Sequence, residues 1–197
     1  MKKILLLGAT GRTGRLLLPM LANDENEVTA YVRDTAKAAD LLQRNVTVAE
    51  GDVTDLDKLS SCMADKDIVI AILSGDVLAY AKNIASALKQ STVQRVIWVT
   101  GMGIHHEVPG LVGKLLDRLS RQMPEYVQAA DTIAGSGTDY TLIRAAHLTD
   151  GNNAEYYVQH EGEKLHANNV DRIAMARFIA DLVAKEEGIS QSLGVTN

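Results

Sequence analysis

Residues 8–14 read Gly-Ala-Thr-Gly-Arg-Thr-Gly, and this stretch decides the fold of the chain. It follows directly on the apolar run Lys3 to Leu7 and precedes Arg15 to Ala22, where apolar residues recur at helical spacing. Glycines in such a turn let the chain reverse tightly, bring backbone N–H groups close to a pyrophosphate and pack a helix against a strand. The helix N-terminus adds unpaired N–H groups and partial positive charge for the anion.

The order of strand, turn and helix predicts a dinucleotide-binding turn, although the glycine spacing is GxxGxxG rather than GxGxxG. A structural turn without a ligand is the alternative interpretation. The residues of this turn that we predict to contact the cofactor are Gly8, Thr10, Gly11, Arg12, Thr13 and Gly14.

Short β-rich runs alternate with longer helical patterns, which is typical of βαβ units around a parallel sheet. Strands covered on both faces are near-continuous apolar runs, and six are predicted, at Lys3 to Leu7, Glu27 to Val32, Val46 to Glu50, Ile68 to Leu73, Arg95 to Thr100 and Tyr140 to Ile143. Crossover helices are predicted at Arg15 to Ala22, Ala36 to Arg44, Leu56 to Met63 and Val77 to Gln90. Two later helices are expected, one within Leu111 to Ala134 that is interrupted around Pro124, and one at Val170 to Ala184. A short edge strand is expected at Tyr156 to Val158. We therefore predict an α/β, single-domain, doubly wound Rossmann fold with a mainly parallel sheet, in which residues 1–197 form one NAD(P)-binding domain.

Composition and charge exclude several classes of protein. The chain has 197 residues, enough for one large domain but short for two, and its 46% apolar and 23% charged residues are typical of a globular protein. The net charge of -5, without a run of Lys or Arg, argues against a nucleic-acid partner. The apolar run before Gly8 is too short for a signal peptide, and no stretch is long enough for a membrane span. Cys62 is the only cysteine, so an internal disulfide and a thiolate metal cluster are both excluded. We expect a cytoplasmic protein without a metal, a nucleic-acid partner or a membrane partner; the sequence leaves the oligomeric state open.

The second predicted strand leads into Arg33, about 20 residues beyond the glycines, where a dinucleotide fold places a group beside the adenosine ribose. A carboxylate at this place accepts the ribose hydroxyls of NAD, whereas Arg33 would pair with the 2′-phosphate of NADP. Arg12 is expected to close on the same phosphate from the other side. The sequence thus predicts NADP (NADPH) rather than NAD; a surface salt bridge between Arg33 and Asp34 is the alternative.

With these motifs the chain resembles the atypical short-chain dehydrogenase/reductase group, in particular the small NAD(P)H-binding proteins similar to flavin reductase/biliverdin reductase B and the NmrA-like proteins. The resemblance covers nearly the whole chain and rests on the glycine turn, Val32 to Asp34, Gly51 to Val53, Val96 to Thr100 and Asp139 to Arg144. It implies cofactor contacts by Asp52 and Val53 at the adenine, by Leu73 and Ser74 on the ribose side, and by Thr100, Gly101 and the loop after Arg144 at the nicotinamide.

The chain departs from the wider superfamily at its catalytic motif. Carbonyl-reducing members use a Tyr-x-x-x-Lys pair for proton transfer, and none of the six tyrosines here has a lysine four positions later. Tyr126, for example, is followed by Ala130. After Arg144 the chain reads Ala145-Ala146 instead of the family's usual Pro-Gly.

Without that pair, an alcohol or carbonyl dehydrogenase is disfavoured. Conjugated acceptors delocalise the incoming charge and can take a proton from solvent, so the protein mainly has to hold two rings face to face. We expect an NADPH-dependent oxidoreductase that transfers hydride to a small-molecule acceptor of the flavin or quinone type. The alternative is a non-catalytic NADP(H)-binding redox sensor or regulator of the NmrA-like type; a lyase or isomerase lacks a recognisable carboxylate pair.

The candidate catalytic residues are Thr100, Tyr126 and His147. Thr100 offers the only hydroxyl at the end of the fifth predicted strand, and His147 falls in the loop after the sixth. His105 and His106 follow the fifth strand and could also face the acceptor, a surface or capping role being the alternative for all three histidines.

Overall fold

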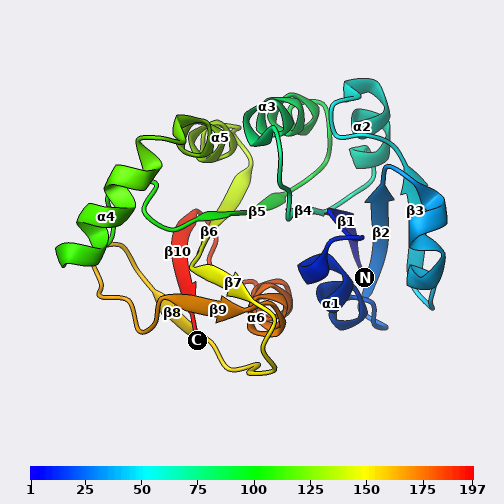
Figure 1. Cartoon of the computed structure of the whole chain (residues 1–197). Coiled ribbons are helices and arrows are strands. Elements are labelled where there is room, and N and C mark those ends of the chain that lie inside the picture. The colour runs from blue at the N-terminus through cyan, green and yellow to red at the C-terminus, as the bar shows by residue number, and fades with distance from the viewer.

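The six strands predicted from the apolar runs are neighbours in one eight-stranded sheet of the computed structural model, which describes all residues, 1–197 (Figure 1). The strand order is β3-β2-β1-β4-β5-β6-β10-β8, and every pair is parallel except β10 with β8. The strands are β1 (Lys2–Leu7), β2 (Asn26–Val32), β3 (Val46–Glu50), β4 (Ile68–Ala71), β5 (Arg95–Gly101), β6 (Asp139–Ala145), β8 (Tyr157–Gln159) and β10 (Gln191–Thr196). Because the order reverses between β1 and β4, the carboxyl ends of these two strands flank the switch point at which open α/β sheets bind ligands.

Helices cover both faces of the sheet (Figure 1). One face carries α1 (Arg12–Leu21) and α6 (Arg172–Lys185). The other carries α2 (Leu56–Met63), α3 (Val77–Leu88) and α5 (Pro124–Ala134). The remaining helix, α4 (Gly110–Ser120), stands at one end of the molecule, away from α1 and α2. None of the helices combines the length and the apolar character that a bilayer span requires.

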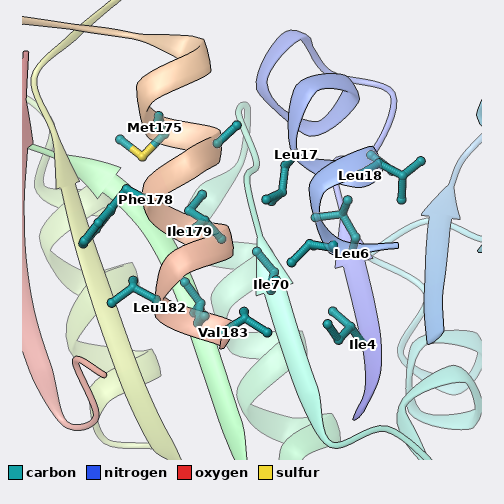
Figure 2. Close-up of a cluster of buried hydrophobic side chains, with 14 of the residues drawn as sticks. Ile4, Leu6, Leu17, Leu18, Ile70, Met175, Phe178, Ile179, Leu182 and Val183 are labelled. Atoms are coloured by element: carbon teal, nitrogen blue, oxygen red, sulfur yellow. The ribbon is translucent and has the colours of Figure 1, made fainter. Parts of the chain in front are cut away.

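The core lies in two layers, one on each side of the sheet. Successive side chains of a strand point to opposite faces, so Ile4 and Leu6 pack with α1 and α6 (Figure 2), whereas Leu5 and Leu7 pack with the helices of the other face. All four side chains have no exposed surface. A strand buried on both faces must be apolar throughout, which is why β1 appears in the sequence as an uninterrupted run.

The structure confirms the α/β Rossmann fold and corrects four details. The helix expected at Ala36 to Arg44 is a 3-10 helix, η1 (Thr35–Leu41), whose two buried residues, Ala38 and Leu41, are three apart, the period of that helix. The first helix begins at Arg12 instead of near Arg15.

The other two corrections concern missed strands. The strand β10 was not predicted, because Gly194 interrupts its apolar pattern. Also not predicted were β7 (His147–Thr149) and β9 (Asn169–Asp171), which form a separate two-stranded parallel sheet. The expected break at Pro124 is present, because α4 ends at Ser120 and α5 begins at the proline.

Candidate functional site

Two adjoining pockets open at the carboxyl ends of the parallel strands, beside the glycine turn. They have volumes of 170 and 470 Å³ and share Gly11, Ile72, Leu73 and Ser74 in their linings. Of the residues predicted to contact the cofactor, the first pocket is lined by Gly8, Thr10, Gly11, Arg33, Asp52, Val53, Leu73 and Ser74. The second is lined by Gly11, Arg12, Thr13, Gly14, Leu73, Ser74, Thr100 and Gly101, together with Tyr126 and His147. The structure therefore brings all the predicted site residues to one continuous cleft.

The turn between β1 and α1 is packed too closely for side chains at its key positions. Gly8 has a positive φ of 90°, which favours glycine. A Cβ atom on Gly14 would lie 2.2 Å from the carbonyl oxygen of Gly8. These two glycines let the first turn of α1 lie directly on the end of β1.

The N-terminus of α1 has features that suit an anion. No side chain caps it, and no acidic residue lies in its first turn. Among the α-helices, side chains cap only α2 and α3, through Asp55 on the amide of Lys58 and Asp76 on the amide of Ala79, both at 3.1 Å; of the uncapped helices, α1 is the one that follows the glycine turn. The uncapped N–H groups and partial positive charge of α1 fit the pyrophosphate of a dinucleotide.

Arg33 follows β2 and lines the first pocket with an exposed side chain. No ion pair involves it, and the salt bridge with Asp34 is absent. Asp34 instead caps η1 at the amide of Ala36, 3.0 Å away, and lies 3.8 Å from Lys37. Across the pocket, hydrogen bonds from the backbone and the hydroxyl of Thr54, aided by the charge of Arg33, hold the pKa of Asp52 below its usual value.

Arg12, which was expected to close on the 2′-phosphate opposite Arg33, lines the second pocket, whereas Arg33 lines the first. Its Nη1 atom is 2.7 Å from Oδ2 of Asp150, whose Oδ1 is 2.6 Å from Nη1 of Arg172. Arg172 also lines the second pocket and is the first residue of α6. One carboxylate thus joins the N-terminal ends of α1 and α6, and two guanidinium groups lie beside the glycine turn.

Thr100, Tyr126 and His147 meet at the second pocket, from β5, the first turn of α5 and the start of β7. The Oγ1 atom of Thr100 is buried without a hydrogen-bond partner. Leaving such a group unsatisfied costs about 1–3 kcal/mol, so a polar group of a bound ligand would stabilise it. The orphaned hydroxyl, the uncapped helix and the close-packed glycines together fit a nicotinamide dinucleotide.

His105 and His106 lie outside the cleft. Nε2 of His105 is 2.9 Å from Asp131 on α5, and Nδ1 of His106 is 2.9 Å from Asp117 on α4. The two residues therefore fasten the loop after β5 to neighbouring helices instead of facing an acceptor.

Sequence reasoning missed several residues of the cleft, among them Tyr31, Tyr80 and Arg172. The hydroxyl of Tyr31 donates to the carbonyl of Asp52 at 3.2 Å, and burial raises the pKa of this tyrosine to about 12. Tyr31 could have been predicted to line the cleft from its place near the carboxyl end of β2. Tyr80 and Arg172 come from helices, where no local pattern distinguishes them from ordinary surface or packing residues.

Comparison with known proteins agrees with this geometry. A family model described as NAD(P)H-binding matches residues 8–186, which include the glycine turn and both pockets. The chain belongs to the NAD(P)H-binding family. The predicted membership of the atypical short-chain dehydrogenase/reductase and NmrA-like group is thereby confirmed.

Relatives of this NAD(P)H-binding protein include named oxidoreductases. It is 30% identical over 124 residues to an NAD(P)H azoreductase from Xenophilus azovorans, a match that covers 62% of this chain and 43% of that one. It is 26% identical over 146 residues to quinone oxidoreductase 2 of Escherichia coli (strain K12), covering 72% of this chain and 47% of the relative. The chain thus spans less than half the length of these two curated relatives.

Among solved structures, a Rossmann-fold NAD(P)-binding family protein from Shigella flexneri superposes with a TM-score of 0.83 at 30% identity. The superposition covers 100% of this chain and 94% of that one. The NAD(P)H-binding protein therefore shares the Rossmann fold of this structure over its whole length.

Proposed function

We propose that the protein is an NADPH-dependent reductase that transfers hydride to a flavin-like or quinone-like acceptor and acts as one domain over residues 1–197. The observation that carries the proposal is the second pocket, which combines Thr100, Tyr126 and His147 but contains no Tyr-x-x-x-Lys pair. Bound NADPH supplies a hydride, and the acceptor must absorb the accompanying charge without a dedicated proton donor.

Different residues of the cleft bind different parts of the dinucleotide. The N-terminus of α1 receives the pyrophosphate, with Arg12 and Arg172 adding positive charge beside it. Asp52 and Val53 face the adenine, and the free guanidinium of Arg33 pairs with the 2′-phosphate. Thr100 donates its unpartnered hydroxyl to the nicotinamide end.

A conjugated acceptor fits the polar groups that remain. Tyr126 and His147 can orient a ring and donate modest hydrogen bonds, while the one proton that accompanies the hydride comes from water. The names of the two curated relatives support this acceptor class, because azo and quinone groups are both conjugated systems.

The test is single-turnover oxidation of NADPH with a panel of flavins and quinones. We expect turnover, and losses of at most about tenfold in Thr100→Val, Tyr126→Phe and His147→Ala, since each side chain contributes one modest hydrogen bond. A general acid would supply about 10²–10⁴-fold, so a thousandfold loss in one variant with NADPH affinity intact would disprove the acid-free mechanism. Tight NADPH binding without turnover of any acceptor would instead identify a redox regulator.

A further inference from the structure

A third pocket, of 380 Å³, adjoins the cleft on the side of α4 and takes no part in the function proposed above; we call it the α4 pocket. Its apolar lining comes from the loop after β5, from α4 and from the segment before β9, through Met102, Val112, Leu115, Leu116 and Leu165. We propose that it binds the apolar side chain of a quinone whose ring lies in the second pocket. This inference rests on the proposed function and specifies its acceptor.

The two pockets share a wall, which decides what can occupy the α4 pocket. Ala145, Ala146 and His147 line both of them. The two pockets therefore lie side by side at these residues, so a ligand in the second pocket that is long enough to pass them reaches the α4 pocket.

The outer wall of the α4 pocket consists of apolar side chains that the rest of the chain leaves uncovered. Val112 is 44% exposed and Leu115 is 60% exposed. The inner side of α4 is fixed by Leu116, because a Cβ atom on Gly103 would lie only 2.5 Å from the Cβ of this leucine. The helix thus has a packed inner side and an open apolar wall next to the cleft, and a hydrophobic ligand would remove that wall from water.

The lining also determines which acceptors are disfavoured. His147 and Asn168 are its only polar side chains, and no Lys, Arg, Asp or Glu contributes. A phosphate group, such as that of flavin mononucleotide, would lose its hydration here without gaining a counter-ion. An alkyl or prenyl substituent loses nothing by entering. In the reaction, the quinone accepts a hydride from NADPH and a proton from water and leaves as the hydroquinone, with NADP⁺ as the other product.

The experiment compares two benzoquinones with the same ring, one without a side chain and one with a decyl chain. For the wild type we expect kcat/KM to be at least tenfold higher with the decyl quinone, because each buried methylene contributes about fourfold. Leu115→Glu should bring this ratio close to one. Leu119→Glu, the same change one turn further along α4 at an exposed leucine outside the pocket, should keep the wild-type ratio.

Binding is measured separately, by calorimetric titration of the decyl quinone into the protein saturated with NADP⁺, where no hydride is available. Affinity should fall at least tenfold in Leu115→Glu and in a second variant, Val112→Gln, and not in Leu119→Glu. Reduction of both quinones at equal kcat/KM, or a preference for flavin mononucleotide over the decyl quinone, would overturn this inference and leave the proposed function standing. Reduction of no acceptor by a protein that binds NADPH would overturn both.

Discussion

Arg33 is the residue on which the choice between the two dinucleotides depends. Its side chain is exposed at the first pocket and has no ion-pair partner, while the neighbouring Asp34 is occupied with the end of η1. A free guanidinium at this place gains a charge-assisted hydrogen bond from a 2′-phosphate but nothing comparable from a neutral hydroxyl.

Replacing Arg33 by glutamine should therefore weaken NADPH binding about tenfold or more and leave NADH binding nearly unchanged. Hydrogen bonds to charged groups contribute about 1.5–3 kcal/mol, and screening at an exposed site moves the effect toward the lower end. Calorimetric titrations with both cofactors measure the two affinities. The control is Arg44→Gln, which removes an exposed arginine paired with Asp24 outside the cleft. Equal affinity of the wild type for NADPH and NADH would contradict the assignment.

The glycine turn joins β1 to α1, and its glycines are not equivalent. A Cβ atom on Gly14 would meet backbone at 2.2 Å and 2.9 Å, whereas one on Gly11 would meet only the carbonyl oxygen of Gly8, at 3.1 Å. A side chain on Gly14 would therefore force the turn away from the helix. A side chain on Gly11 would require a shift of only a few tenths of an ångström at the carbonyl of Gly8.

We expect Gly14→Ala to lower the free energy of unfolding by about 1–3 kcal/mol, as overpacking does, and to weaken NADPH binding by displacing the turn. Gly11→Ala should cost less than about 1 kcal/mol. Urea denaturation without cofactor gives the stabilities, and calorimetry gives the affinities. Two variants of equal stability would show that the turn adapts more freely than the close contacts indicate.

The elements that sequence reasoning found are those whose signal is local. The central strands are apolar on both faces, so Lys2–Leu7 and Arg95–Gly101 appear as continuous runs, and their ends mark the cleft. The strand Gln191–Thr196 was missed because its first two residues are polar and a glycine interrupts the apolar pattern, and it forms by pairing with β6 and β8. The contacts of Asp150 with Arg12 and with Arg172 could not be predicted, since they join segments far apart in the sequence.

At the scale of the whole molecule, one buried ion pair ties the loop after β5 to the C-terminal half. Nη1 of Arg144 lies 2.9 Å from Oε1 of Glu107, and both side chains are 1% exposed. The same guanidinium donates to Ser192 on β10 and to the carbonyl of Gln159 on β8. Burial acts to raise the pKa of Glu107, but hydrogen bonds from the amides of the loop and from Arg144 outweigh it, and the pKa lies below its usual value.

Glu107→Gln should destabilise the protein by about 3–5 kcal/mol at pH 7, because it leaves Arg144 buried without a counter-ion. The folded-state pKa of Glu107 is depressed, so its contribution is present above the unfolded pKa of about 4.3 and is lost as the pH falls through the folded value. Stability measured by urea denaturation should therefore differ most between wild type and variant near neutrality and converge in acid. Glu161→Gln, at an exposed glutamate, serves as the control. A difference that stays constant down to pH 3 would contradict this account.

The place of β10 between β6 and β8 has a consequence for how the chain is made. On the ribosome, Asp139–Ala145 emerges about fifty residues before its partner Gln191–Thr196. At about 5–20 residues per second, the outer edge of β6 remains without its neighbour for several seconds, and Arg144 lacks the partners on β10. An unpaired strand edge is a template for pairing with other chains. Nascent copies on one polysome are therefore most prone to associate with one another in the interval before β10 is synthesised.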